Sequence, residues 1–377
     1  MRIAYPMRVD ALDKPGGDLL QVIKYIEAGK IAKEDGQPRF KGTIITDLHA
    51  DLSSFDLIHL TNIDRPVDTY HSFICAKTTG RPILLSPIHH SYTEIGRFER
   101  SGRSGIAGQI SGLLGFTALE YLRSSARSRR YSQLISPTLN VMRVGMRESQ
   151  RAILTGAELI LVLTEKEKAD IILDFGEISD KNFVFLRNGF EVRSHESNNV
   201  TGRDIDVCMV GRIEARKNQI KVLKVLKRLG ISGIFVGAEN PHHRSYCTQF
   251  KSMVLNSGSR YMGSISHEDT LKLMRRSRVH VSASWYEVLS MVDLEAYSAG
   301  CGIVASQCGG TQEILGDRAE YVYPESEESI ENGIVSMLKR VSGVTPSCIS
   351  ERRDEPLSET WDQIGSTLAQ LYRECVG

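Results

Sequence analysis

Four features that point to other classes of protein are missing from this sequence. It has no run of the roughly 18 apolar residues that a membrane-spanning helix needs, and residues 1–17 lack the apolar stretch of a secretory leader. It has no basic excess of the kind typical of nucleic-acid-binding proteins, because 47 Lys and Arg balance 46 Asp and Glu. Its seven cysteines form no Cys-x-x-Cys pair, and an odd number suits a reducing compartment. We therefore expect a cytoplasmic protein.

What the chain does contain is enough material for two globular domains. Its length of 377 residues exceeds twice the roughly 150 residues of a typical domain. Apolar residues make up 41% and charged residues 25%, as in soluble proteins that bury a core.

Short apolar runs alternate with helix-length segments, which predicts an α/β fold built on parallel sheets. The clearest helix is expected from near Lys217 to Leu229, closed by Gly230. The expected strands are 2–5, 56–61, 82–86, 158–163 and 183–186 in the first half, and 206–211, 233–236, 279–283, 302–305 and 321–323 in the second.

A polar stretch separates the two halves. Residues 191–204 are rich in Ser and Asn and are expected to be a linker. We therefore predict an N-terminal Rossmann-like lobe over 1–190 and a C-terminal one over 205–350, facing each other across a cleft. Apolar residues at helical spacing predict a closing helix within 351–377 that packs back on the N-terminal lobe.

Three strand ends in the second half carry the chemistry. In VCMVGRIEARKNQ, Arg212 and Lys217 can converge on one anion such as a diphosphate, although two solvated surface cations remain the alternative. In WYEVLSMVDLEAYSAG, Glu287 lies in the entrance of a helix expected near Leu289, and Glu295 lies two turns in. The helix N-terminus offers N–H groups to a phosphate; surface helix charges are the plain alternative. In GIVASQCGG, Gly309–Gly310 permits a close backbone approach or a simple tight turn.

Together these segments resemble the retaining glycosyltransferases of family 4 (glycosyl transferases group 1), which have the GT-B fold. The resemblance covers 206–324 through the patterns GR…K, E-x7-E and S-x-x-G-G-x-x-E, and it is looser over the first half. It implies that Arg212 and Lys217 hold the donor diphosphate, that Glu295 binds the ribose, and that Glu287 contacts the donor sugar.

The resemblance implies further roles for the first lobe and for the helix entrance. Gly17 would let backbone approach the donor phosphate, and His89, with His90 as the alternative, would lie beside the reacting anomeric carbon. Val288, Leu289 and Ser290 stand where the family commonly has glycine, which is a departure from its pattern. The backbone N–H groups remain available, and those of Leu289 and Ser290 would bind phosphate.

Neither a metal nor a cofactor is expected. Asp204-Ile205-Asp206 resembles a metal-binding Asp-x-Asp but only precedes a strand, and His242-His243 lacks partners at metal-ligand spacing. The leaving diphosphate itself would take the acceptor proton while the two cations balance its charge.

Residues 97–130 carry seven Arg against two Glu around an apolar centre, so this segment is either a peripheral contact with an anionic membrane or a core helix with solvated flanks.

The leading hypothesis is an enzyme that transfers a hexose from a UDP- or GDP-sugar to a saccharide or a lipid-linked saccharide, in surface polysaccharide or lipopolysaccharide synthesis. The alternatives are a non-catalytic GT-B subunit that binds a nucleotide or a partner, and a nucleotide-sugar epimerase of the same fold. A Rossmann dehydrogenase is disfavoured because no Gly-x-Gly-x-x-Gly follows the first strand.

Overall fold

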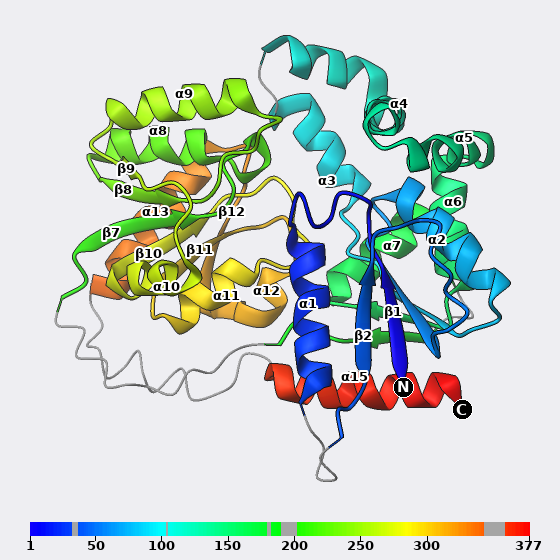
Figure 1. Ribbon diagram of the computed structural model, residues 1–377. Helices are drawn as coiled ribbons and strands as arrows, with labels where there is room; N and C mark the ends of the chain where they lie inside the picture. Colours follow the sequence, from blue (N-terminus) through cyan, green and yellow to red (C-terminus); the bar gives the residue numbers. More distant parts are fainter. Residues whose placement is uncertain (32–36, 103–104, 179–181, 190–201, 343–358) are drawn as a thin grey trace. The chain divides into compact units, whose positions relative to one another are not determined.

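The computed structural model describes residues 1–31, 37–102, 105–178, 182–189, 202–342 and 359–377, with the backbone alone at 105–116 and 182 (Figure 1). The chain folds into two compact units. The N-terminal unit comprises Met1–Tyr92, Leu113–Glu191 and Ser358–Gly377, and the C-terminal unit comprises Thr93–Gly112 and Val192–Leu357. The residues 93–112 therefore cluster with the C-terminal unit, which differs from the single N-terminal lobe expected over 1–190.

The N-terminal unit is built on a six-stranded parallel sheet in the order β2-β1-β3-β4-β5-β6. Its strands are β1 (Arg2–Pro6), β2 (Lys41–Ile45), β3 (Leu57–Thr61), β4 (Ile83–Ser86), β5 (Leu159–Val162) and β6 (Asn182–Phe185). The helical segments of this half of the chain are α1 (Gly17–Lys30), α2 (Pro66–Thr78), α3 (Tyr92–Arg97), η1 (Phe98–Gly102), α4 (Gly105–Arg130), η2 (Ser132–Leu134), α5 (Ile135–Val144), α6 (Met146–Gly156) and α7 (Glu165–Phe175).

Successive side chains of each strand point to opposite faces of this sheet. Both faces are covered, because each set of side chains packs into an apolar cluster of its own. In β3, Leu57 packs into one apolar cluster while Ile58 and Leu60 pack into the other. Burial on both faces explains why these strands read as continuous apolar runs.

The C-terminal helix α15 (Trp361–Val376) completes one of these clusters. Leu368 and Tyr372 pack against α1 and the sheet, and the Tyr372 hydroxyl is 2.7 Å from both the Tyr5 hydroxyl and the Nδ1 atom of His59. Thr360 caps the helix start by accepting the N–H of Gln363. A segment from the far end of the sequence therefore belongs to the core of the N-terminal unit (Figure 1).

The C-terminal unit has a second six-stranded parallel sheet, in the order β12-β11-β10-β7-β8-β9. Its strands are β7 (Ile205–Val210), β8 (Gly233–Val236), β9 (Arg260–Tyr261), β10 (Ser277–Ser282), β11 (Gly302–Ser306) and β12 (Ala319–Val322). Its helices are η3 (Ala215–Lys217), α8 (Gln219–Leu229), α9 (Arg244–Leu255), α10 (His267–Arg276), α11 (Met291–Ser298), α12 (Thr311–Leu315), η4 (Gly316–Arg318) and α13 (Glu327–Ser342).

The predicted α/β fold with two Rossmann-like lobes is confirmed. All ten predicted strands are present with ends shifted by at most two residues, and the predicted helix is α8, whose C-cap Gly230 has a left-handed φ of 69°. The strands β2 and β9 were not predicted, and most of the expected linker lies outside the described residues. No helix in the described part of the chain is both long and apolar enough to cross a membrane.

Candidate active site

In the C-terminal unit, the loops after β7 and β10 start from neighbouring strand ends. Chain order reverses at this point of the sheet, because β8 follows on one side of β7 while β10 lies on the other. Open α/β sheets bind ligands at such a switch point, beyond the carboxyl ends of the strands. The sequence-predicted residues Arg212, Lys217 and Glu287 all lie on these two loops.

The two loops are joined through the carboxylate of Glu287. The Lys217 ammonium contacts its Oε1 atom, and the Nη1 atom of Arg216 lies 3.2 Å from its Oε2 atom. The side chains of all three residues are mostly buried, which strengthens these charge interactions relative to water. The structure thus brings together two of the predicted site residues and adds a third that was not predicted.

Arg216 is fixed from several directions. It pairs with Glu214 at 3.1 Å, donates to the carbonyl of Tyr286 at 3.2 Å, and lies over the Tyr286 ring. The guanidinium fork suits this role because its donors lie in one plane. The sequence signal was the Arg-Lys pair in EARKN, from which only the lysine was chosen.

Glu214 interacts electrostatically with the three cations that follow β7, which are Arg212, Arg216 and Lys217. Burial raises its pKa, but Arg216, the Asn240 amide, Lys217 and Arg212 together hold the pKa below its usual range. This carboxylate therefore stays ionised and offsets part of the positive charge. Arg212 is the most exposed of the three cations, and its carbonyl accepts from the Gln219 amide at 2.7 Å.

The predicted glycine pair packs against the Glu287 loop. A β-carbon at Gly309, whose φ is +134°, would lie 3.0 Å from the Glu287 carbonyl oxygen. The N–H of Gly310 donates to the Val288 carbonyl at 2.8 Å. Here a close backbone approach, rather than a plain turn, requires glycine.

Helix α11 begins at Met291, two residues later than expected, because Ser290 is its N-cap and accepts the N–H of Asp293. The side chains of Leu289 and Ser290 are buried, so only their backbone could meet a ligand. Asp293 is itself buried, and its Oδ2 atom accepts from Ser282 at 2.9 Å. These contacts tie the helix entrance to the end of β10.

Glu295 lies in α11 with 28% of its side chain exposed. Its Oε1 atom is 3.9 Å from the Nε2 atom of His267, at the start of α10. His267 belongs to none of the sequence motifs, so its position beside Glu295 was not predicted.

In the N-terminal unit, Gly17 is the first residue of α1. A β-carbon there would meet nothing within 4 Å, whereas one at the N-cap Gly16 would lie 2.7 Å from Asp18. Asp18 accepts the N–H of Leu19 and pairs with Arg8 at 2.9 Å. The helix start therefore already holds a carboxylate beside the open space at Gly17.

His89 is enclosed by carboxylates. Its Nδ1 atom lies 2.7 Å from Asp64 and its Nε2 atom 2.9 Å from Asp174, and the side chain is fully buried. Burial lowers its pKa, but the two carboxylates outweigh that effect and raise the pKa to about 10. Both ring nitrogens are thus engaged by carboxylates of the same unit, and a place for His89 beside the reacting carbon stays a prediction.

The neighbouring His90 is partly open to solvent. Its side chain is 23% exposed, and its Nδ1 atom and backbone N–H both lie 2.8 Å from Asp64. Ile88, just before the pair, has a left-handed φ of 47°, which is strained for a β-branched residue. Such strain is concentrated at functional sites, where the surrounding contacts hold it in place.

The residues considered as metal ligands have other partners. Asp204 pairs with Arg276 and Asp206 with Arg278, so the two carboxylates are engaged separately. His243 accepts the N–H of Ala215 at 3.3 Å. Among the described residues, no three His, Cys, Asp or Glu side chains form a group that could hold a metal.

The two units define a GT-B fold, and comparison with solved structures supports this class. The chain superposes on sucrose-phosphate synthase from Thermosynechococcus elongatus with a TM-score of 0.68 and 16% identity, covering 99% of this chain and 98% of that one. It superposes on Anabaena HepE in complex with UDP-glucose with a TM-score of 0.62 and 14% identity, covering 99% and 100%. At these identities the likeness shows the fold alone.

Comparison of sequences supports the glycosyltransferase group 1 family. Residues 191–342 match the family model described as "Glycosyl transferases group 1". An uncharacterized glycosyltransferase of Methanocaldococcus jannaschii is 28% identical over 115 residues, or 30% of each chain. The glycogen synthase of Mycobacterium tuberculosis is 24% identical over 173 residues, covering 44% of this chain and 42% of that one. The chain thus spans less than half the length of these relatives.

Proposed function

We propose that the protein is a retaining glycosyltransferase of family 4, which moves a hexose from a UDP- or GDP-sugar to a saccharide or a lipid-linked saccharide. The observation that carries the proposal is the pairing of Glu287 with Lys217 and Arg216 at the switch point of the second sheet. A glycosyl donor needs both charges there: cations for its diphosphate and a carboxylate for its sugar hydroxyls.

In this proposal Lys217 serves both partners. An ammonium has three donors, so it can keep its bond to Glu287 while another N–H meets a phosphate oxygen. Arg212 supplies the second contact to the diphosphate, and Arg216 keeps the Glu287 carboxylate in place. Glu295 binds the ribose, and backbone N–H groups near Leu289 and Ser290 bind phosphate oxygens.

The chemistry follows from this division of charge. As the bond from the sugar to the diphosphate breaks, negative charge grows on the leaving group, and positioned cations lower the barrier by stabilising it. The diphosphate then accepts the proton of the acceptor hydroxyl, which attacks from the same face, so the configuration is retained. From the N-terminal unit, His90 contacts the donor sugar, held by Asp64, and Gly17 admits the phosphate. The proposed setting is surface polysaccharide or lipopolysaccharide synthesis.

The first experiment is a thermal-shift screen with UDP, GDP, ADP, CMP and dTDP, with and without Mg²⁺. A ligand that binds the native state raises the free energy of unfolding by mass action, by about 2.7 kcal/mol at a ligand concentration of 100 times its Kd. The melting temperature rises as a result. A selective shift without Mg²⁺ supports the Arg–Lys site and identifies the base. If no nucleotide shifts the melting temperature, donor binding is refuted and a scaffold role is favoured.

The second experiment uses variants of the paired residues. Lys217→Ala and Glu287→Gln should each lower transfer at least a hundredfold, because each removes a group that meets the reacting region. Lys227→Ala is the matched control, since it removes an exposed lysine of α8 that lies off the site. Near-normal transfer by both site variants would overturn the assignment. Donor cleavage that needs no acceptor would favour the epimerase instead.

A further inference from the structure

A buried histidine and a buried aspartate lie beneath the entrance of α11. His280 of β10 and Asp293 in the first turn of α11 have side chains that are 0% and 1% exposed, and the Nδ1 atom of the ring is 3.4 Å from the Oδ1 atom of the carboxylate. Among the described residues, neither of these two atoms has a hydrogen bond to any other group. Each atom therefore depends on the other to offset the hydration that it lost on burial.

The second ring nitrogen shows where the proton of His280 lies. The N–H of Val210, at the end of β7, donates to Nε2 at 3.3 Å. A nitrogen that accepts has no proton of its own, so the ring proton is on Nδ1 and is directed at Asp293. The imidazole thus connects the last residue of β7 to the first turn of α11.

The carboxylate of Asp293 is turned away from the start of the helix and toward the sheet. Its Oδ2 atom accepts from the Ser282 hydroxyl at 2.9 Å and lies 3.4 Å from the Thr311 hydroxyl. With His280 beside Oδ1, both oxygens are directed away from the helix entrance. The N-cap Ser290 accepts the N–H of Asp293, but the Asp293 side chain does not accept the N–H of Ser290 in return.

This orientation is unusual for an acidic residue at the third position of a helix. When serine or threonine is the N-cap, the polar side chain three residues later commonly reaches back and accepts the N-cap N–H, which makes a capping box. Helix α15 of the same chain has such a box, between Thr360 and Gln363. A carboxylate is further attracted by the partial positive charge of the helix start. In α11 the contacts on the sheet side oppose both tendencies.

We propose that His280 is a positioning residue of the donor site. It holds the Asp293 carboxylate away from the α11 entrance, so that the N–H of Ser290 is left for a phosphate oxygen of the donor. This role rests on the proposed function, which takes the backbone N–H groups near Leu289 and Ser290 as phosphate ligands. Without the histidine, the carboxylate would turn back, occupy the N–H of Ser290 and place a negative charge beside the diphosphate. The ring itself is fully buried and does not touch the donor.

Two carboxamide variants separate the roles of the two ring nitrogens. His280→Asn keeps a donor near the position of Nδ1, whereas His280→Gln reaches the position of Nε2 and leaves Asp293 without its partner. The probes are UDP and GDP, whose Kd values are measured by calorimetry without Mg²⁺. We expect His280→Gln to bind the nucleotide about tenfold more weakly, which is the typical strength of a capping contact, and His280→Asn to stay within about twofold of the original protein.

A second substitution distinguishes this role from support of the fold alone. Asp293→Ala removes the group that would turn back, so the double variant His280→Gln/Asp293→Ala should bind nucleotide about tenfold more tightly than His280→Gln. If His280 only supported the fold, the second change would add to the damage. Hydrogen exchange gives a readout that needs no ligand. The amide of Ser290 should exchange more slowly in His280→Gln, because the carboxylate accepts its N–H, and should return to the original rate in the double variant.

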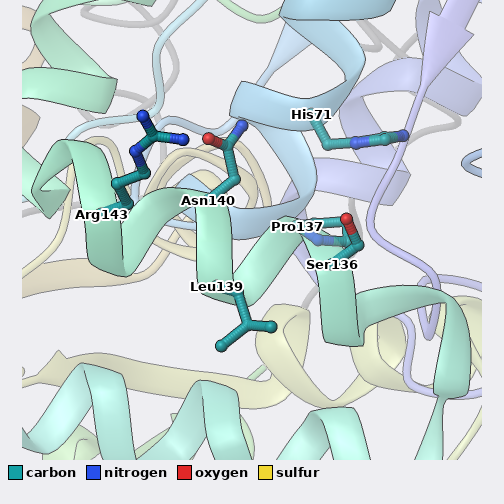
Figure 2. A pocket seen from close by; sticks show the side chains of 6 residues that line it. All are labelled: His71, Ser136, Pro137, Leu139, Asn140 and Arg143. Atoms are coloured by element: carbon teal, nitrogen blue, oxygen red, sulfur yellow. The ribbon is translucent and has the colours of Figure 1, made fainter.

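The matched control is His71→Gln in the N-terminal unit. The Nε2 atom of His71 lies 3.1 Å from the Leu48 carbonyl oxygen, so this ring also contacts the backbone through Nε2. Figure 2 shows His71 at the hollow of about 290 Å³ that it lines together with residues of α5. The same chemical change at this place should leave both nucleotide binding and the exchange of the Ser290 amide unaltered.

Several outcomes would overturn the proposal. They are equal losses of binding in His280→Asn and His280→Gln, a double variant that binds no better than His280→Gln, and an equal loss in the His71→Gln control. If neither nucleotide binds the original protein, the proposed function fails, and the exchange measurement still decides about His280. A slower Ser290 amide in His280→Gln would then support the hold on Asp293, and an unchanged or faster one would refute it.

Discussion

Replacing His89 should destabilise the N-terminal unit, because this residue is a buried cation between two carboxylates. His89→Gln removes the cation between Asp64 and Asp174, whose carboxylates lie 2.7 and 2.9 Å from its ring nitrogens. Removing one partner of a buried ion pair costs about 3–5 kcal/mol. For a unit of this size the melting temperature falls by about 2–4 °C per kcal/mol, so we expect a loss of roughly 6–20 °C.

The size of this loss should depend on pH with a predictable sign. The folded protein keeps a proton on His89 up to a pKa of about 10, whereas an unfolded histidine releases it near its ordinary value of 6.5. The stabilisation is therefore complete below about pH 6.5 and declines as the pH rises, until it is lost above about pH 10. The difference between the variant and the original protein should shrink over the same interval.

The assay is urea unfolding at several pH values between 6 and 10, followed through the fluorescence of Trp361 in a Trp285→Phe background, so that the signal reports the N-terminal unit. His90→Gln is the control, because its partly exposed ring should contribute only up to about 1 kcal/mol. A pH-independent loss for His89→Gln would refute the buried imidazolium. So would an equal loss for His90→Gln.

Three further changes test other contacts. Gly237→Ala should destabilise the C-terminal unit by about 3 kcal/mol or more, because the new β-carbon would collide with the Gly211 carbonyl oxygen and because Gly237 has a φ of +148°. An unchanged melting temperature would contradict this packing. Tyr372→Phe should cost about 1–3 kcal/mol in urea unfolding by leaving buried polar partners unpaired, and a neutral effect would refute that network. Arg216→Lys should raise the donor KM about tenfold at nearly unchanged stability, because one ammonium cannot reproduce the fork that holds Glu287; a normal KM would remove Arg216 from the site.

The sequence was sufficient for most of the fold because most strands are buried on both faces. Such strands read as apolar runs whatever their neighbours are. The two missed strands are edges: β2 is half-exposed along its length and β9 has only two residues. Their positions depend on pairing with a partner strand, which composition does not record.

The candidate site was predictable where function follows from local order along the chain, as for Lys217 and Glu287. It was not predictable where tertiary contacts choose between neighbours. His89 and His90 are adjacent and chemically identical, and carboxylates 25 and 85 residues away along the chain decide that the His89 ring is the buried one. Arg216 and Lys217 are also adjacent, and the short turn η3 lets both reach Glu287.

The exchange of segments between the two units sets the order in which a growing chain can fold. The N-terminal unit lacks part of its core until α15 has been synthesised, because Leu368 and Tyr372 fill the cluster beneath α1. The C-terminal unit, by contrast, includes no segment beyond Leu357, and its other segment, Thr93–Gly112, was made much earlier. The half whose main segment is translated second therefore has all its segments before the half that is translated first, which reverses the usual N-to-C order.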